Sequence, residues 1–228
     1  WLFEAFTNLR VGRLIEFRKK NHENDWSAFV ILKNLSRGIH QIYHYDGYVL
    51  LMDTYNNAIM KYCPKSCAIT ETSYPFGRLR DGRQSTNYMH MNSITRHKDG
   101  FLVMCHNETI KTGRNSEIAV LDEKLNLMQL VNTDAACAHD IQLYKQKMIY
   151  LDSLGGNIVH GDKKIIQNGR FLKGLAVRDE NIIYGDNQHT VRGDRFSTFS
   201  EVVSVNTDTM VESSRVETTG VIQQIAII

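Results

Sequence analysis

The sequence predicts an all-β fold made of repeated sheets, and three observations support this. A polar residue, an apolar strand, a tight turn and a second apolar strand that often ends in Asp recur along the chain. The copies are 34 to 52 positions apart and open at His40, Asn92, His139, Lys173 and Gln223. The apolar runs are short, and no segment keeps a helical period over three turns. Hairpin repeats of this period are typical of a β-propeller, and five copies predict five blades.

Each of the first four copies continues with two further strand-like segments, which gives four strands per blade. In chain order, the expected strands are 40–44, 48–53, 58–62 and 68–72; 92–96, 101–106, 117–121 and 127–131; 139–143, 148–152, 156–160 and 163–167; and 173–177, 181–186, 201–205 and 210–214. The last blade takes its first strand from 223–227 and its other strands from 2–6, 13–17 and 26–31. The N- and C-terminal strands would thus close the ring, which removes open sheet edges.

Length and composition predict a single β-propeller domain over residues 1–228. A net charge of +2 gives no reason to expect nucleic-acid binding. No apolar run approaches the roughly 20 residues that a membrane helix needs, so no membrane contact is expected. Cys63 and Cys67 have the spacing of half a metal site, but the chain has no second close pair. We therefore interpret the four cysteines as reduced thiols of a cytoplasmic protein.

Functional side chains are expected on the face where the first strand of each blade starts beside the central channel. The second strand returns to that face, so its last residue lies near the first residue of the first strand. The strand starts predict an inner ring of His40, Asn92, His139, Lys173 and Gln223, and the strand ends add Asp53, His106, Asp152 and Asp186. His90 lies two residues before Asn92, so in an extended segment it would share the same face.

Imidazoles in this ring predict a metal site. His40, His90 and His139 are the metal candidates, with Asp53 and Asp152 as further ligands or as residues that orient the ligands. Zinc, iron, manganese or calcium would be the divalent ion. The alternative is structural: the histidines bind water or the next blade, and each Asp accepts backbone N–H groups of the following turn.

The charge of Lys173 allows two interpretations. Its ammonium needs a counter-charge, which Asp186 of the same blade or an anionic substrate group could supply. Three long loops, 73–90, 107–116 and 187–199, add arginines and aromatic residues on the expected face. Arginine binds carboxylate or phosphate in a bidentate fork, which favours an anionic substrate.

The repeated copies quoted above resemble the β-propeller superfamily, broadly the NHL-repeat and gluconolactonase-like kind. That resemblance implies a ring of blades around a divalent ion held by carboxylate and Asn side chains. At the equivalent positions this chain has His, Asn, His, Lys and Gln.

These patterns predict an enzyme that acts on a small polar anionic substrate, sugar-like or phosphorylated, by lyase, hydrolase or epimerase chemistry. The predicted catalytic residues are His40, His139, Lys173, Asp53 and Asp152. The predicted substrate-binding residues are Arg78, Arg80, Tyr88, Asn92, His106, Arg114, Asp186, His189, Arg192 and Gln223. The alternative function is a non-catalytic propeller module that binds a protein or a glycan.

Overall fold

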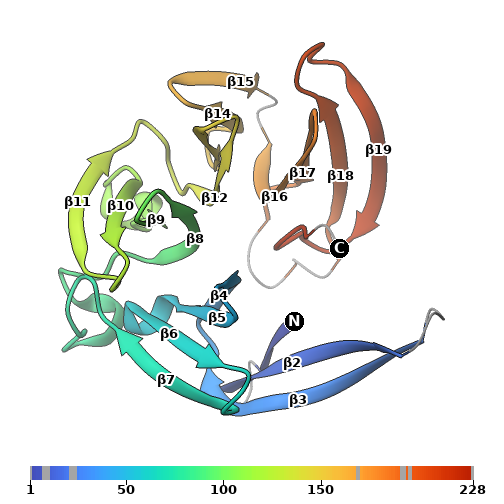
Figure 1. Cartoon of the computed structure of the whole chain (residues 1–228). Coiled ribbons are helices and arrows are strands. Elements are labelled where there is room, and N and C mark those ends of the chain that lie inside the picture. Colours follow the sequence, from blue (N-terminus) through green and yellow to red (C-terminus); the bar gives the residue numbers. More distant parts are fainter. Residues whose placement is uncertain are drawn as a thin grey trace. The chain divides into compact units, whose positions relative to one another are not determined.

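The computed structural model of the chain describes residues 2–6, 11–20, 25–167, 170–190, 194 and 197–226. Within these ranges antiparallel β-sheet dominates, as Figure 1 shows. The helical segments whose bounds the structure describes are α1 (Thr109–Thr112), a single α-helical turn, and two 3₁₀ turns, η1 (Thr54–Asn56) and η2 (Gly82–Gln84). None of the described helices is long and apolar enough to cross a membrane.

Four sheets have four strands each, and in each of them the strands follow one another in chain order. The first two sheets comprise β4 (Ile39–Tyr45), β5 (Tyr48–Asp53), β6 (Ala58–Cys63) and β7 (Ala68–Ser73), and then β8 (Met91–His97), β9 (Gly100–Cys105), β10 (Glu117–Asp122) and β11 (Leu127–Asn132). The other two comprise β12 (His139–Tyr144), β13 (Lys147–Asp152), β14 (Asn157–His160) and β15 (Lys163–Gln167), and then β16 (Phe171–Arg178), β17 (Asn181–Asn187), β18 (Phe199–Asn206) and β19 (Glu212–Thr219).

The number of blades differs from the prediction. The N-terminal strands form a sheet of three, comprising β1 (Leu2–Phe6), β2 (Val11–Lys20) and β3 (Asp25–Ser36). The described part of the predicted C-terminal strand, within residues 221–226, is irregular and forms no ladder. The described residues therefore form four complete blades, and the prediction of a fifth, closed by strands from both termini, was wrong.

Two glycines explain where the C-terminal segment goes instead. A Cβ on Gly185 would lie 2.7 Å from Ile222 Cγ2, and a Cβ on Gly174 would lie 3.0 Å from the same carbon. The Ile222 backbone N–H donates to Asn187 Oδ1 at 2.7 Å. The segment thus packs by side-chain contacts on the β16–β17 sheet, which the alternating apolar pattern could not distinguish from strand pairing.

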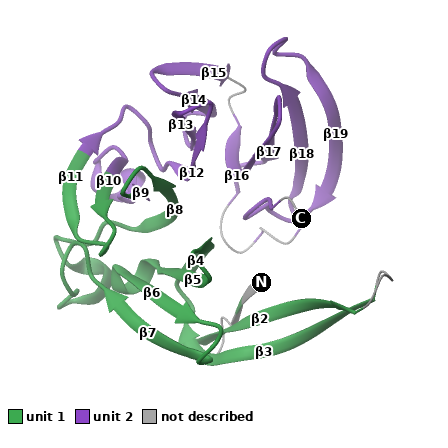
Figure 2. Ribbon diagram, in the orientation of Figure 1, with its two compact units in different colours: residues 1–103, 119–130 green, residues 104–118, 131–228 purple. Residues whose placement is uncertain are grey.

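The chain divides into two compact units, residues 1–103 with 119–130 and residues 104–118 with 131–228, coloured green and purple in Figure 2. Each unit has its own apolar core. A core cluster of unit 1 contains Leu14, Ile39, Val49, Leu51 and Tyr62. A core cluster of unit 2 contains Tyr144, Ile149, Leu151, Ile158, Leu172, Leu175, Ile182, Tyr184, Val203 and Val205.

A register shift interrupts the first strand of three sheets near the residue that the sequence marked as polar. The ladder shifts between Ile39 and Gln41 in β4, between His139 and Gln142 in β12, and between Leu172 and Leu175 in β16. Such β-bulges re-aim side chains and occur beside functional sites. Here the polar strand starts leave the regular ladder.

Candidate functional sites

In unit 1 the candidate site begins at His40, the second residue of β4. The hydroxyl of Thr54 carries one hydrogen, which it donates to the Met91 carbonyl, so the His40 ring donates to that hydroxyl through Nδ1. A neutral His40 ring therefore carries its lone pair on Nε2. The same hydroxyl connects the starts of β4 and β8, because Met91 is the first residue of β8.

A second imidazole stacks beside the first. The ring centroids of His40 and His90 are 5.1 Å apart and their planes are tilted by 31°. His90 has φ 50°, so it is not in an extended strand, and the expectation that it shares a strand face with Asn92 was wrong. The hydroxyl of the buried Tyr88 lies 3.1 Å from His90 Nδ1. Asn92 is itself buried and accepts a hydrogen bond from Ser93 at 3.0 Å.

Two arginines lie over Tyr55, which follows Thr54 in η1. The Arg83 guanidinium is 4.6 Å from the Tyr55 ring centroid and that of Arg37 is 5.9 Å away. The Tyr55 ring meets His40 edge-on at 6.1 Å. A Cβ on Gly38 would lie 2.4 Å from Tyr55 Cγ, so the missing side chain at position 38 makes room for this ring.

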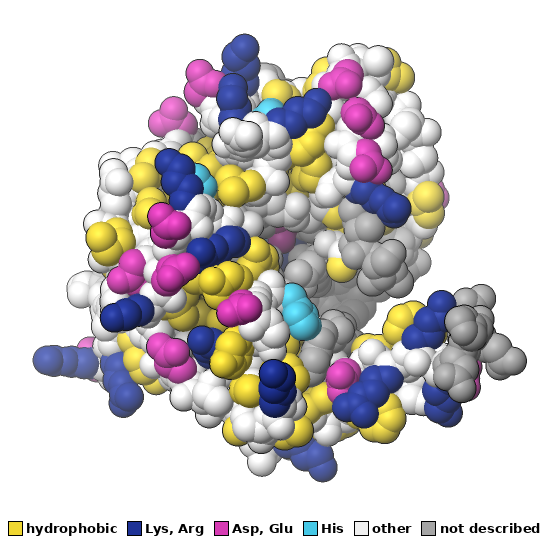
Figure 3. Space-filling view, viewed as in Figure 1, with side chains coloured by type: hydrophobic (Ala, Val, Ile, Leu, Met, Phe, Trp, Pro, Cys, Tyr) yellow, Lys and Arg dark blue, Asp and Glu magenta, His cyan; other side chains and the backbone are white. Residues whose placement is uncertain are grey.

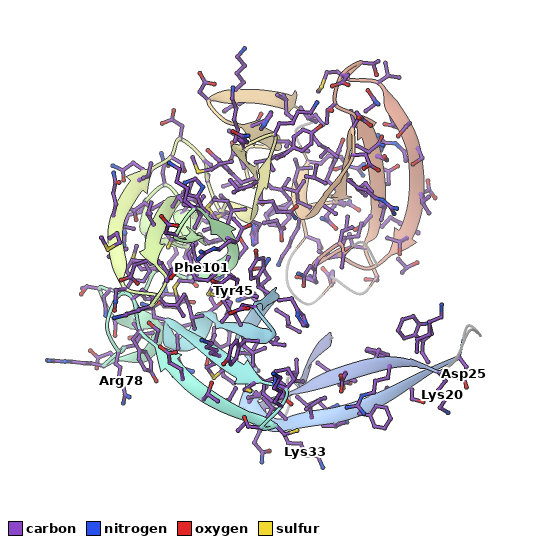
Figure 4. The ribbon with its side chains drawn as sticks, in the orientation of Figure 1. Lys20, Asp25, Lys33, Tyr45, Arg78 and Phe101 are labelled. Atoms are coloured by element: carbon purple, nitrogen blue, oxygen red, sulfur yellow. The ribbon has the colours of Figure 1, made fainter. Side chains whose placement is uncertain are left out.

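The predicted substrate-binding arginines of the 73–90 loop, Arg78 and Arg80, have no described contact with Tyr55. Arg78 is exposed and stacks on Tyr74 with 4.6 Å between guanidinium and ring centroid, at the margin of unit 1 in Figure 4. Arg80 is also exposed. Arg37 and Arg83 were missed as binding residues. The available signal for Arg37 was its position three residues before His40, and Arg83 lies in the long loop 73–90.

In unit 2 a second histidine pair forms at the corresponding place. His139, only 6% exposed, lies with Nδ1 2.8 Å from Ser153 Oγ and meets His106 edge-on at 5.0 Å and 77°. The Glu108 backbone N–H donates to His106 Nδ1 at 3.0 Å. This ring nitrogen is therefore an acceptor, so the proton of a neutral His106 is on Nε2.

The ring contacts of unit 2 continue outward from His139. Phe171 lies 6.0 Å from His139 and 5.7 Å from the exposed His189, both edge-on. The structure thus joins three of the predicted site residues in one row of ring contacts: His106 meets His139, and Phe171 connects His139 to His189. Arg192 lies outside the described residues.

The three strand-end aspartates differ in their partners although each is buried. Asp152 accepts hydrogen bonds from the Ala136 and Gly155 backbone N–H groups at 2.9 and 3.2 Å and from Asn157 Nδ2 at 2.7 Å. Asp53 accepts one, from Asn56 Nδ2 at 2.7 Å, and its Oδ1 has no hydrogen-bond partner among the described residues. The Asp152 arrangement is that of an aspartate that holds a turn, and its catalytic role stays a prediction.

The third aspartate, Asp186, pairs with arginines. Asp186 Oδ2 lies 3.3 Å from Arg170 and 3.9 Å from Arg215. Burial raises the pKa of Asp186, and the nearby Arg170 acts against this rise. Its Oδ1 is buried without a hydrogen-bond partner in the part of the chain that the structure describes.

Lys173 lies beside the C-terminal segment. Its ammonium donates to Gln223 Oε1 at 2.6 Å, so two predicted ring residues meet within unit 2. The neighbouring Gly174 N–H donates to Asp140 Oδ2 at 2.8 Å. Burial raises the pKa of Asp140 to about 6, although this hydrogen bond and the Lys173 charge both lower it. Sequence reasoning missed Asp140, whose only signal was its position directly after His139.

The α1 loop positions Arg114 away from these ring contacts. Arg114 is exposed and pairs with Glu117 Oε2 at 2.8 Å, and the same carboxylate accepts from Asn107 Nδ2 at 2.7 Å. In the described ranges, no three His, Cys, Asp or Glu side chains form a group that could hold a metal ion. The predicted metal ligands His40 and His90 lie in unit 1, and His139 lies in unit 2.

No protein-family model matches the chain, and no curated protein sequence matches it. Solved structures do. The Neurospora crassa Pan2 WD40 domain gives a TM-score of 0.58 at 10% sequence identity, over 97% of this chain and 67% of that chain. A chain of the nidogen/laminin complex gives 0.59 at 9% identity, over 90% of this chain and 75% of that chain. WD40 domains are β-propellers, and this likeness shows that the chain has a β-propeller fold.

A designed protein, Ika8, matches with a TM-score of 0.49 and 8% identity over 99% of this chain. The chain spans 64% of that designed protein, which is less than two-thirds of its length. At these identities the likeness concerns fold alone, and fold does not determine function.

Proposed function

We propose that this β-propeller is a recognition module that binds an anionic group, a phosphate monoester or a carboxylate, at the Tyr55 site of unit 1. This site comprises Arg37, His40, Tyr55, Arg83 and His90. The observation that carries the proposal is the stacking of two guanidinium groups on one phenol ring beside an imidazole pair. Around the Tyr55 ring lie two guanidinium groups and the His40 imidazole, and His90 stacks on His40.

The charge balance of the Tyr55 site supports an anionic ligand. Arg83 is exposed and forms no ion pair with a described Asp or Glu. The nearby Asp53 is buried and accepts from Asn56. A guanidinium held by an aromatic face keeps its N–H edge available for a planar or tetrahedral anion.

Acid–base catalysis on the bound anion is the second candidate function. It is favoured by the hydrogen-bond direction at His40, because donation through Nδ1 leaves the lone pair of a neutral ring on Nε2. A general base needs such a nitrogen within reach of its substrate. Thr54 itself is an unsuitable nucleophile because it is fully buried.

The test is a binding titration of the full chain with glucose 6-phosphate, with glucose as the uncharged control. We expect Arg83→Gln to weaken phosphate binding by about tenfold, because it removes one charge-assisted contact. Arg78→Gln is the matched control, since Arg78 also stacks on a tyrosine of the same loop but not on Tyr55.

Three outcomes are informative. Equal losses in Arg83→Gln and Arg78→Gln, or equal binding of glucose and glucose 6-phosphate, would contradict the proposal. Phosphorus NMR of the same mixtures follows any conversion of the sugar phosphate. Conversion that disappears in His40→Ala would replace plain recognition by the catalytic function.

A further inference from the structure

A second polar cluster lies in unit 2, on the sheet formed by β16 to β19, and it shares no residue with the Tyr55 site. A pocket of about 320 Å³ there is lined by Arg170, Phe199, Glu201 and Glu217. Figure 3 shows acidic side chains, in magenta, gathered over the β18 and β19 strands next to basic ones. A pocket of this size is at the small end of ligand sites and matches a single functional group with its aliphatic stem.

Three carboxylates form a row across the strands beside this pocket. Asp186 on β17 is the cross-strand partner of Glu201 on β18, and Glu201 is the partner of Glu217 on β19. Residues directly opposite in a sheet have close Cβ atoms, and like charges at such positions destabilise the pairing. Positive charge beside the three carboxylates is therefore needed to offset their mutual repulsion.

The protein supplies part of that charge. Arg170 and Arg215 each contact both Asp186 and Glu201, and the second contact of Arg215 measures 2.7 Å. Glu217 has no ion pair among the described residues. One oxygen of Asp186, whose side chain is 3% exposed, is likewise without a hydrogen-bond partner there. Arg215 also pairs with Glu212 at 2.7 Å. Arg170 and Arg215 thus contact the inner two carboxylates of the row, and no ion pair to the outer one occurs in the part of the chain that the structure describes.

The remaining wall of the pocket is aromatic. Phe199 is 66% exposed, which is unusual for a large apolar side chain and leaves the ring available to a ligand. A guanidinium group can stack on such a ring while its edge donates to a carboxylate. A compact ammonium would satisfy the carboxylate but gain less from the flat ring.

We propose that this pocket binds a guanidinium group, the functional group of an arginine side chain, between Phe199 and Glu217. Glu217 would accept its hydrogen bonds, and Glu201 would contribute negative potential from the neighbouring strand. Asp186 and the two arginines hold Glu201 in place. This site is independent of the anion-binding proposal, because it shares no residue with the Tyr55 site.

The experiment is a two-dimensional NMR titration of the full chain with agmatine, which carries a guanidinium on a four-carbon stem. We expect shifts of β18 and β19 amides and an affinity about tenfold lower in Glu217→Gln. Glu180→Gln is the matched control, because Glu180 is exposed in the β16–β17 turn and changes the net charge equally. Phe199→Leu keeps an apolar side chain and is expected to weaken binding by about fivefold.

Two further ligands test whether the pocket prefers a guanidinium to an ammonium group, and whether the guanidinium belongs to a protein or to a small molecule. Butylammonium carries the same type of charge without the planar fork and is expected to bind more weakly than agmatine. The peptide acetyl-Gly-Arg-Gly-amide is expected to bind at least as well as agmatine if the natural ligand is a protein arginine, and less well if it is a small guanidine. Equal affinity of Glu217→Gln and Glu180→Gln, equal binding of butylammonium, or no shifts with either guanidine would overturn the proposal.

Discussion

The two units each bring two histidines into ring contact, but the surroundings of the pairs differ. In unit 1 the rings of His40 and His90 are tilted by 31° and partly exposed, and His40 also meets Tyr55 with its two arginines. In unit 2 His139 is buried, meets His106 edge-on and packs against Phe171. The same sequence position, a histidine whose Nδ1 bonds a hydroxyl 14 residues later, therefore supports a polar rim in one unit and core packing in the other.

The aspartates at the ends of β5 and β13 also differ between the two units, and their substitution predicts the largest loss of unfolding free energy. Asp152→Ala would leave three donors without their acceptor, and we expect a loss of about 4 kcal/mol of unfolding free energy. Asp53→Ala removes one accepted hydrogen bond, and we expect a loss of about 1 kcal/mol. Urea unfolding of the two variants measures the difference, and equal losses would refute the idea that only Asp152 holds a turn.

The second largest expected effect is a decrease of the unfolding free energy as the pH rises. The pKa of Asp140 is about 6 in the folded chain and near 3.8 in the unfolded chain. The folded state therefore holds the extra proton between these values, so stability falls as the pH rises from about 4 to about 6, by up to about 3 kcal/mol.

Asp140→Asn tests this assignment. Its amide oxygen can still accept from the Gly174 N–H, while the titrating charge is removed. We expect the unfolding free energy of the variant, measured by urea unfolding at several pH values between about 4 and about 6, to lose the decrease with pH that is due to Asp140. The exposed Asp162→Asn, in the β14–β15 turn, should keep the slope of the parent chain. An unchanged slope in Asp140→Asn would refute the assignment.

Substitutions in the two histidine pairs are expected to lower the unfolding free energy by less, and only the one in unit 1 is expected to weaken ligand binding. We expect His139→Ala to cost about 2 kcal/mol, because it removes a buried ring from its contacts and orphans Ser153. His40→Ala should cost about 1 kcal/mol and also weaken glucose 6-phosphate binding by about fivefold. Thermal unfolding and the binding titration together check this. A His139→Ala protein that folds normally but loses phosphate binding would reverse the roles given to the two pairs.

How much the sequence could predict depends on the interaction involved. Strand positions in the four complete blades follow from local alternation and turn residues, and the predicted 48–53 matches β5 and 163–167 matches β15 in full. The choice of a partner does not follow from local pattern. The predicted strand at 223–227 has the alternation of a strand, but Gly174 and Gly185 offer Ile222 a packing site.

In the candidate sites, too, local sequence pattern does not determine which side chains become partners. The sequence placed Lys173, Gln223, His106 and His139 on one face, and the structure brings Lys173 to Gln223 and His106 to His139. Gln223 reaches Lys173 from an irregular segment, however, and not from the predicted fifth blade. It suggested Asp186 as a partner of Lys173, whereas the ion pairs of Asp186 are with Arg170 and Arg215. Long side chains such as arginine reach across several strands, so sequence spacing does not determine which carboxylate they meet.

The smallest effect concerns the glutamines that bridge neighbouring sheets beside the bulges. In unit 1 the Gln41 Oε1 accepts from the Ile94 N–H at 2.5 Å, whereas in unit 2 Gln142 Nε2 donates to the Leu175 carbonyl at 2.5 Å. Gln41→Leu leaves a buried N–H without an acceptor, but Gln142→Leu leaves only a carbonyl. A buried N–H without an acceptor is rarer and costs more than a buried carbonyl that loses one donor, because a carbonyl has two lone pairs and can accept a second hydrogen bond.

We therefore expect losses of about 1.5 kcal/mol for Gln41→Leu and about 0.5 kcal/mol for Gln142→Leu in urea unfolding. Leucine is close to glutamine in volume, so the comparison isolates the polar group. A larger loss in Gln142→Leu would mean that the bond from β12 to β16 matters more than the orphaned donor. In that case the bulges of unit 2, and not those of unit 1, would be the ones that fix the spacing of adjacent sheets.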